Sequence, residues 1–245
     1  MAWLLIDNSN SRTKLRLADS NGLLEWRATV PTSGLSPETL EETLAGVDFS
    51  GVVLASVVPE KAEMISRYFD GVRDFHALSH RSPLGYGFDL DHPEQIGNDR
   101  LSNVLALKSI HGVPGIAIDF GTAVTFSVLS AEGNFAGGVI APGMAAMTQY
   151  LATRTAQLPE ISPEEPANAI GRTTVEAMRA GAVIGQRGMV REILRELVRE
   201  TGGRPRIVAT GGGAEFASKG LPEIDILHPD LTLEGLRLLA ARVFQ

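Results

Sequence analysis

The chain has 245 residues, a formal net charge of −7, 44% apolar and 21% charged residues, and no cysteine. This length can bury one substantial hydrophobic core or two smaller ones, so either one or two domains fit. The acidic balance argues against a general binder of nucleic-acid phosphates, which needs a basic face. The absence of cysteine excludes disulfides, thiolate metal sites and cysteine nucleophiles, and makes a reducing cytoplasm the simplest location.

Neither an export signal nor a membrane span is expected. The first residues hold no basic segment and no apolar stretch of sufficient length for a signal peptide. The most apolar later stretch, residues 112–129, is interrupted by Asp119 and by several glycines.

The elements taken in chain order predict a mixed α/β protein. Pro37 is typical of the first position of a helix that ends at Gly46, and Pro59 is typical of the end of a buried strand. In order, the expected elements are a helix from residue 37, a strand at 51–58, a helix at 99–111, a helical region from a capping box at 173–176 to Gly202, a strand at 206–209 and a helix from about residue 232. Alternation of strands and helices indicates α/β layers.

Two short segments resemble each other. Residues 6–17 align without gaps with residues 118–129, so that Asp7 falls on Asp119 and Thr13 on Thr125. In each segment an apolar run is followed by small polar residues and then by an alternating run, as in a strand–turn–strand unit. Because the two lie in different halves of the chain, they indicate either a duplicated domain or a chance repeat.

The two Asp-headed turns are candidate phosphate sites. A carboxylate at a strand end beside a tight turn places an anion next to exposed backbone N–H groups. Those groups can bind phosphate oxygens, while the carboxylate holds a cation. In the first segment Arg12, Lys14 and Arg16 share one face of the strand. The alternative to a phosphate site is an ordinary solvated basic face on a surface hairpin. Neither turn has the spacing of a P-loop or of a dinucleotide-binding glycine motif.

The sequence Gly-Asn-Asp-Arg at residues 97–100 is a candidate substrate site. Asp99 falls in the first turn of an expected helix, where the helix dipole favours the ionised carboxylate. Such a carboxylate can orient a substrate hydroxyl toward a γ-phosphate, and Arg100 can pair with a substrate carboxylate. The plainer interpretation is that Asn98 or Asp99 caps the helix and that Arg100 lies at the surface.

Weaker signals come from three other segments. The glycines at residues 211–213 follow a short strand and would allow an adenine or a ribose to approach the backbone closely. His76 and His80 have the spacing of a helical metal-binding pair, but their surroundings predict strand and turn, which favours surface histidines. Residues 160–165, with prolines beside and among them, predict an exposed loop.

Taken in order, these segments resemble the type III pantothenate kinases, which belong to the superfamily of sugar kinases, actin and heat-shock ATPases. The resemblance extends over nearly the whole chain. In the first half, the matching segments are residues 7–14 for the first phosphate motif and 97–100 for the pantothenate-binding and catalytic motif. In the second half, they are residues 119–123 with Thr125 for the second phosphate motif, 137–143 for the segment that follows it, 156–159, 171–174 and 176–178 for the next block, and 210–212 for the adenosine-side motif.

The resemblance implies an α/β fold of two duplicated actin-like (ribonuclease H-like) domains, with mixed sheets flanked by helices and an ATP cleft between them. The N-terminal domain would span residues 1–112, and the C-terminal domain, with dimerisation elements, residues 113–245. The implied activity is the phosphorylation of pantothenate by ATP to 4'-phosphopantothenate, the first step of coenzyme A biosynthesis. The implied enzyme is a cytoplasmic homodimer that uses Mg²⁺ with ATP and a monovalent cation, K⁺ or NH₄⁺.

Residue by residue, the resemblance implies that Asp99 is the proton acceptor and that Asp119 holds the monovalent cation. The residues implied to contact pantothenate are Gly97, Asn98, Asp99, Arg100 and, from the partner subunit, Thr174. The residues implied to bind ATP are Asp7, Asn8, Ser9, Asn10, Ser11, Arg12, Thr13, Lys14 and Thr122.

Two departures from the family pattern define the alternatives. Ser9 stands where the family's first motif has glycine, which permits close phosphate approach or positive φ. Leu90 stands where many members have a tyrosine, although Tyr86 lies nearby. The alternative to a pantothenate kinase is therefore a nucleotide-binding regulatory homologue with little kinase activity. A third hypothesis is a related kinase for another hydroxylated substrate.

Overall fold

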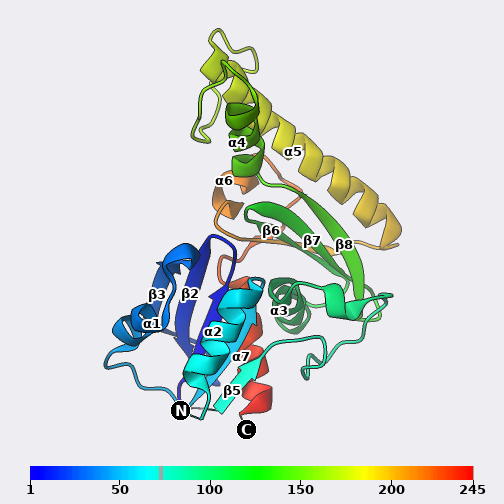
Figure 1. Cartoon of the computed structure of the whole chain (residues 1–245). Helices are drawn as coiled ribbons and strands as arrows, with labels where there is room; N and C mark the ends of the chain where they lie inside the picture. Colours follow the sequence, from blue (N-terminus) through cyan, green and yellow to red (C-terminus); the bar gives the residue numbers. More distant parts are fainter. Residues whose placement is uncertain (72–73, 245) are drawn as a thin grey trace. The chain divides into compact units, whose positions relative to one another are not determined.

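The protein, described as a computed structural model over residues 1–71 and 74–244, consists of two compact units (Figure 1). Unit 1 comprises Met1–Gly112, Gly133–Ala136 and the chain from Asp230 onward. Unit 2 comprises Val113–Glu132 and Gly137–Pro229. The chain therefore passes from one unit to the other more than once.

Unit 1 is built on a five-stranded sheet in the order β3-β2-β1-β4-β5. The β1-β2 and β2-β3 pairs are antiparallel, and the β1-β4 and β4-β5 pairs are parallel. The strands are β1 (Trp3–Asn8), β2 (Arg12–Ala18), β3 (Leu23–Pro31), β4 (Gly51–Ser56) and β5 (Asp74–Ala77). The helices are α1 (Pro37–Leu44), α2 (Pro59–Phe69), α3 (Asn98–Ala106) and α7 (Leu231–Val243), with the 3₁₀ turns η1 (Thr32–Gly34) and η2 (Pro93–Gln95) and the π-helical η3 (Leu107–His111).

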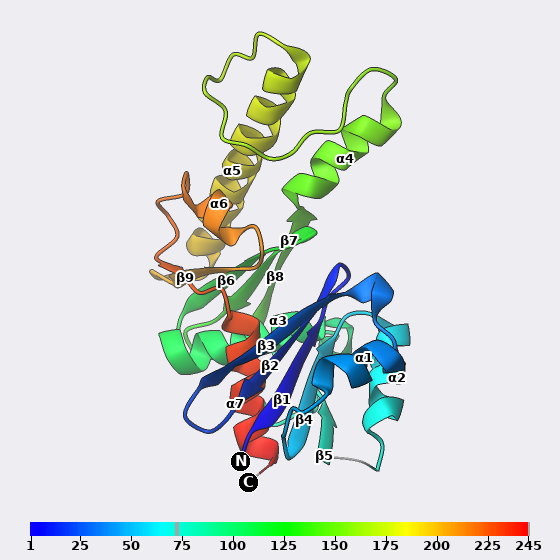
Figure 2. The same cartoon turned by 90° about the vertical axis from the view of Figure 1, so that its left-hand side faces the viewer.

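Helices cover the sheet of unit 1 on both faces (Figure 2). On one face α1 and α2 pack against Leu4, Ile6 and Leu15 in a single hydrophobic core. On the other face α7 contacts β1 and β4. Because β1 is covered on both sides, all six of its residues are buried, Asp7 included.

The C-terminal helix α7 is held in unit 1 by its crossing with α3. Gly235 permits this approach, because a Cβ there would collide with the carbonyl oxygen of Ser102. The hydroxyl of Ser102 donates to the carbonyl of Thr232 at 2.7 Å, and the Thr232 hydroxyl donates to Oδ1 of Asn103 at 2.8 Å. These buried hydrogen bonds join residues about 130 positions apart in the sequence.

Unit 2 repeats the strand order of unit 1. Its sheet has the order β10-β9-β6-β7-β8, so the hairpin β6-β7 takes the place of β1-β2, and β9 and β10 take those of β4 and β5. The elements are β6 (Gly115–Phe120), β7 (Ala123–Leu129), β8 (Phe135–Pro142), α4 (Met144–Arg154), α5 (Thr174–Glu200), β9 (Arg206–Thr210), α6 (Ala214–Ser218) and β10 (Ile226–Leu227). The shared order favours duplication over a chance repeat.

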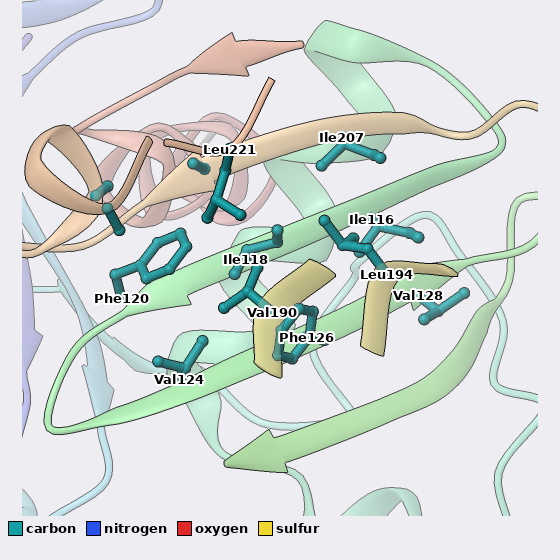
Figure 3. Packing of buried hydrophobic residues seen from close by; sticks show 13 residues of the cluster. Ile116, Ile118, Phe120, Val124, Phe126, Val128, Val190, Leu194, Ile207 and Leu221 are labelled. Atoms are coloured by element: carbon teal, nitrogen blue, oxygen red, sulfur yellow. The ribbon is translucent and has the colours of Figure 1, made fainter. Parts of the chain in front are cut away.

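Figure 3 shows the core of unit 2, where Val190 and Leu194 of α5 lie against apolar side chains of β6 and β7, Ile118 and Phe126 among them. The alternation along each strand sends these side chains to one face, where the helix covers them. This core anchors the C-terminal half of α5 and so fixes one end of the 27-residue helix.

Several predicted element boundaries are confirmed. Ser36 caps α1 by accepting from the backbone N–H of Thr39, and Thr173 caps α5 by accepting from that of Glu176. The capping box is incomplete, because the Glu176 carboxylate accepts from the N–H of Arg172 and not from that of Thr173. The predicted helix at 99–111 is α3 followed by the π-helical turn η3.

The histidine pair is not helical. His76 lies in β5, and its Nε2 is 2.8 Å from the hydroxyl of Ser82. Within residues 1–71 and 74–244, no group of three or more His, Cys, Asp or Glu side chains is arranged to hold a metal ion. Over the same residues, no helix is both long and apolar enough to cross a membrane.

Candidate active site

The first Asp-headed turn connects β1 to β2 in unit 1. The N–H of Ser9 donates to the carbonyl of Arg12 at 3.1 Å, and the Ser9 hydroxyl donates to Oδ1 of Asp7 at 3.1 Å. Asp7 stands opposite Lys14 in the antiparallel register, and the Lys14 ammonium lies 3.9 Å from Oδ2 of Asp7. The turn thus presents a buried carboxylate with one cation beside it, while Asn10 is exposed.

Within unit 1, Asp99 affects the pKa of Asp7. Burial raises the pKa of Asp7, the Lys14 charge opposes this rise, and the nearby Asp99 carboxylate adds to it. Burial likewise raises the pKa of Asp99, against hydrogen bonding to the backbone and the charge of Arg100. The fold therefore brings the first turn and the Gly-Asn-Asp-Arg segment together, which their separation in sequence did not reveal.

Asp99 is not the cap of its helix. Gly97 occupies the N-cap position of α3 without any side-chain cap, so the plainer interpretation of this segment is wrong. Oδ1 of Asp99 accepts from the N–H of Arg100 at 2.7 Å. A Cβ at residue 97 would lie 2.7 Å from that same oxygen, so the glycine leaves room for the carboxylate.

Arg100 is buried, so the surface position that the plainer interpretation predicts for it is wrong. Only 9% of it is exposed, and its guanidinium lies over the ring of Phe135 at 5.5 Å. Phe135 in turn contacts Phe88 and Tyr86, whose hydroxyl donates to the carbonyl of Leu101 at 2.7 Å. Burial lowers the pKa of Arg100, and the Asp99 carboxylate raises it. The Tyr86 hydroxyl therefore has an internal partner and does not simply replace the missing tyrosine at Leu90.

The second Asp-headed turn, in unit 2, is shorter than the first. Asp119 stands opposite Thr125 in its hairpin, whereas Asp7 stands opposite Lys14. In the gap-free sequence alignment Thr125 falls on Thr13, so the pairing across the second hairpin is shifted by one residue relative to the first. The N–H of Gly121 donates to the carbonyl of Ala123 at 3.0 Å and closes the turn. Only the first turn thus places a cation across from its aspartate.

Glycines pack directly against the second turn. A Cβ at Gly211, which has φ +92°, would collide with Oδ1 of Asp119 and lie 2.7 Å from the N–H nitrogen of Phe120. A Cβ at Gly143 would collide with the carbonyl oxygens of Gly121 and Thr122. The glycine loop after β9 therefore packs against Asp119 and Phe120, and the start of α4 packs against the carbonyls of Gly121 and Thr122.

The comparisons with known proteins decide the family. The family model for type III pantothenate kinase matches residues 3–196. A type III pantothenate kinase from Akkermansia muciniphila is 50% identical over 240 residues, which cover 98% of both chains. This chain belongs to the type III pantothenate kinase family. A type III pantothenate kinase from Methylacidiphilum infernorum is 39% identical over 238 residues, which cover 96% of this chain and 87% of that one.

A solved sugar-kinase structure shows the same fold. The inorganic polyphosphate/ATP-glucomannokinase from Arthrobacter sp. strain KM has a TM-score of 0.51 and 14% identity, with 98% of this chain and 99% of that chain covered. At this identity the likeness concerns the fold alone. Together with the two mixed five-stranded sheets, it confirms the predicted actin-like α/β architecture.

In this member of the type III pantothenate kinase family, Ser9 does not need the freedom of glycine. Among the described residues only glycines adopt positive φ, so Ser9 has an ordinary backbone conformation. The departure that motivated a regulatory homologue therefore causes no backbone strain. Gly121, at the corresponding place in the second turn, also lacks positive φ.

Thr174 is exposed at the first position of α5 in unit 2. The loop before it is held to α5 by two ion pairs, Glu164 with Arg179 at 2.9 Å and Glu165 with Arg187 at 2.7 Å. The predicted residues of unit 1 thus lie near Asp7 and Asp99, whereas Thr174 lies in an exposed segment of unit 2.

Sequence reasoning missed two residues that support the unit 1 site. Phe135 lies under Arg100, and Ser56 lies between the first turn and α3. Neither carried a usable local signal, because each acts through partners tens of residues away.

Proposed function

We propose that this chain phosphorylates pantothenate with ATP as the first step of coenzyme A biosynthesis. The pantothenate hydroxyl oxygen attacks the γ-phosphorus, the bond from that phosphorus to the β–γ bridging oxygen breaks, and ADP leaves. The hydroxyl proton passes to the Asp99 carboxylate. Family membership supports the substrate, and the position of Asp99 beside the first turn supports its role.

The surroundings of Asp99 suit this task. Its raised pKa makes it a better proton acceptor than a solvated aspartate, since a catalytic base works best with a pKa near the operating pH. The half-buried carboxylate stays beside the Arg100 charge, which we propose pairs with the pantothenate carboxylate. Gly97 and Asn98 complete the pantothenate-binding segment.

In our proposal, the first Asp-headed turn is the ATP-phosphate site of unit 1. Asn10 and Ser11 are exposed in this turn, which also carries the Lys14 charge, and the exposed Thr122 of unit 2 is likewise proposed to bind ATP. The proposed ATP-binding residues of the first turn and its flanks are Asp7, Asn8, Ser9, Asn10, Ser11, Arg12, Thr13 and Lys14. The need for ATP also supports a cytoplasmic location.

A divalent metal accompanies ATP in a kinase of this family, and we propose Mg²⁺. The lack of a protein metal cluster within the described residues fits an ion held mainly by phosphates and water, as Mg²⁺ usually is beside nucleotides. We propose that Asp119 holds a monovalent cation, K⁺ or NH₄⁺. Oδ1 of Asp119 and the carbonyl oxygen of Phe120 both lie beside Gly211, and oxygen donors of this kind suit a cation that would neutralise phosphate charge.

We further propose a homodimer in which Thr174 contacts the pantothenate of the partner subunit. Large apolar side chains are exposed along β8, α4 and α5 of unit 2, which favours an interface there. They are Ile140 at 66%, Tyr150 at 64%, Leu151 at 39% and Ile184 at 47% exposure.

The test is pantothenate-dependent ADP production by the purified wild-type protein and by Asp99→Asn. We expect turnover in the wild type and a loss of roughly 10²- to 10⁴-fold in the variant, the usual contribution of a general base. Full activity of Asp99→Asn would remove Asp99 from the mechanism, and an inactive wild type would refute the function. Replacing K⁺ by Na⁺ tests the cation, with the thermal midpoint of unfolding as a readout besides activity.

Mixed dimers test the role of Thr174. Asp99→Asn and Thr174→Ala homodimers should both be impaired, whereas mixing the two subunits creates one site with both residues intact. Regained activity on mixing supports the proposal. Activity that stays at the level of the separate variants would place Thr174 in its own subunit's site or outside the site.

A further inference from the structure

Ser56 lies between the first turn and the start of α3. It is the last residue of β4 and stands beside Asn8, the last residue of β1, in the parallel pair. Its hydroxyl donates to Oδ1 of Asn8 at 2.6 Å. Its carbonyl oxygen accepts from Nδ2 of Asn98 at 3.1 Å. One residue therefore contacts both the segment that forms the first turn and the segment that carries Asp99.

On the side of the turn, the hydrogen bonds continue from Asn8 to the backbone. Asn8 is 1% exposed, and its Nδ2 donates to the hydroxyl of Thr13 at 2.8 Å. The Thr13 hydroxyl lies 3.1 Å from that of Thr32, which donates to the carbonyl of Ser9 at 2.7 Å. Buried polar networks with satisfied partners are rigid, so Ser56 supports the conformation of the turn through Asn8.

On the side of α3, Ser56 and its neighbour fix the start of the helix. Asn98 is the first residue of α3 and adjoins Asp99. The N–H of Val57 donates to the carbonyl of Asn8 at 3.1 Å, and a Cβ at Gly97 would lie 3.5 Å from a Val57 methyl group. The end of β4 is thus in contact with both catalytic segments of unit 1.

We propose that Ser56 is a positioning residue that holds the first turn and Asp99 at a fixed separation. The inference rests on the proposed function of both segments. Ser56 acts through Asn8 and Asn98 and needs no contact with a reacting atom. Phosphoryl transfer depends on positioning, so a small displacement between the phosphate turn and the proton acceptor lowers the rate strongly.

The test compares Ser56→Ala with the matched control Ser50→Ala. Ser56→Ala removes two hydrogen bonds, the one that the Ser56 hydroxyl donates to Oδ1 of Asn8 and the one that it accepts from the N–H of Val58. Ser50 precedes the other end of β4, where its hydroxyl donates to the carbonyl of Ala2 at 3.2 Å. We expect Ser56→Ala to lower kcat about ten- to a hundredfold with smaller changes in both KM values. Ser50→Ala should keep the wild-type kcat, and Ser56→Thr, which retains the hydroxyl, should recover most of the rate.

The inference is overturned if kcat of Ser56→Ala stays within about twofold of that of Ser50→Ala, or if Ser56→Thr is as slow as Ser56→Ala. Wild-type protein without turnover would refute the proposed function instead. A second measurement tests the inference without turnover. Backbone hydrogen exchange in Ser56→Ala should accelerate both at residues 8–12 and at residues 97–101 relative to Ser50→Ala, and unchanged exchange at either segment would overturn the link.

Discussion

A Cβ atom at Gly211 would collide with Oδ1 of Asp119, so the glycine loop after β9 is in direct contact with the second Asp-headed turn. The parallel register explains the contact, because Asp119 pairs with Thr210, the residue before the loop. Gly211 also has φ +92°, a conformation that L side chains rarely adopt.

Gly211→Ala should therefore destabilise unit 2 and weaken ATP binding. The positive φ and the overpacking together cost roughly 2–4 kcal/mol. Gly212→Ala is the control for stability, since a Cβ there meets no described atom within 4 Å. Urea unfolding and the ATP KM measure the two effects. Equal stability of the two variants would contradict the predicted collision.

Asp99→Asn should keep or raise stability at neutral pH while it strongly lowers activity. The folded protein holds the Asp99 proton more strongly than the unfolded chain, because the pKa of this carboxyl is raised. Stability contributed by this group therefore falls as pH rises from the unfolded pKa of about 4 through the folded pKa. Asparagine removes that loss and can still accept from the N–H of Arg100.

The measurement for this prediction is denaturant unfolding of wild type and Asp99→Asn at pH 7 and near pH 4. The advantage of the variant should be present at pH 7 and diminish toward pH 4. The prediction is contradicted if the free energy of unfolding of the variant is below that of wild type at pH 7 but not near pH 4. That result would show that the ionised carboxylate stabilises the fold, against the direction of its pKa shift.

Ser9→Gly should leave the ATP KM within about threefold of wild type. Ser9 already has an ordinary φ, and its backbone is held by hydrogen bonds from Thr32 and to Arg12. The substitution removes only the hydrogen bond that the Ser9 hydroxyl donates to Oδ1 of Asp7. Steady-state kinetics checks this, and a large drop in the ATP KM would show that the Ser9 side chain obstructs the nucleotide.

Gly235→Ala and Gly188→Ala should change stability in opposite directions. A Cβ at Gly235 would collide with the carbonyl of Ser102 where α7 crosses α3, and overpacking of this kind costs roughly 1–3 kcal/mol or more. Gly188 lies in α5, and a Cβ there meets no described atom within 4 Å, so alanine gains up to about 1 kcal/mol of helix propensity. Thermal unfolding of both variants measures the difference. Two shifts of the same sign would contradict the prediction.

Phe135→Leu should raise the pantothenate KM more than the ATP KM, because it removes the ring beneath the Arg100 guanidinium. Loss of such a cation–π contact corresponds to roughly a three- to thirtyfold change. Phe69→Leu is the control, since Phe69 is an equally buried ring of unit 1 with aromatic neighbours. Equal effects of both variants on the pantothenate KM would assign the change to general core damage.

Local signals predicted much of the secondary structure. Ser36 with Pro37 marked the start of α1, and Thr173 marked the start of α5, because capping and proline geometry act within a few residues. The helices α2 and α4 were not predicted. Pro59 follows the end of β4 and also occupies the first position of α2, and proline is typical of both places, so it does not by itself indicate the helix.

The arrangement of the site depended on contacts distant in sequence. The segment Gly133–Ala136 belongs to unit 1, although its neighbours on both sides belong to unit 2, and it brings Phe135 beneath Arg100. The pairing of Asn8 with Ser56 and the crossing of α3 with α7 are likewise long-range. No periodicity or spacing in one sequence indicates which buried residues will meet, since many partners would satisfy the same pattern.

By itself the sequence determined the two Asp-headed turns, the order of the family's motifs and the type of most elements, because these depend on chemistry within a few residues. The tertiary structure alone decided that Asp7 and Asp99 lie near each other, that Arg100 is buried over an aromatic ring and that Ser9 adopts an ordinary φ. Burial and the proximity of charges set the pKa of a carboxylate, and both arise only when distant segments pack together.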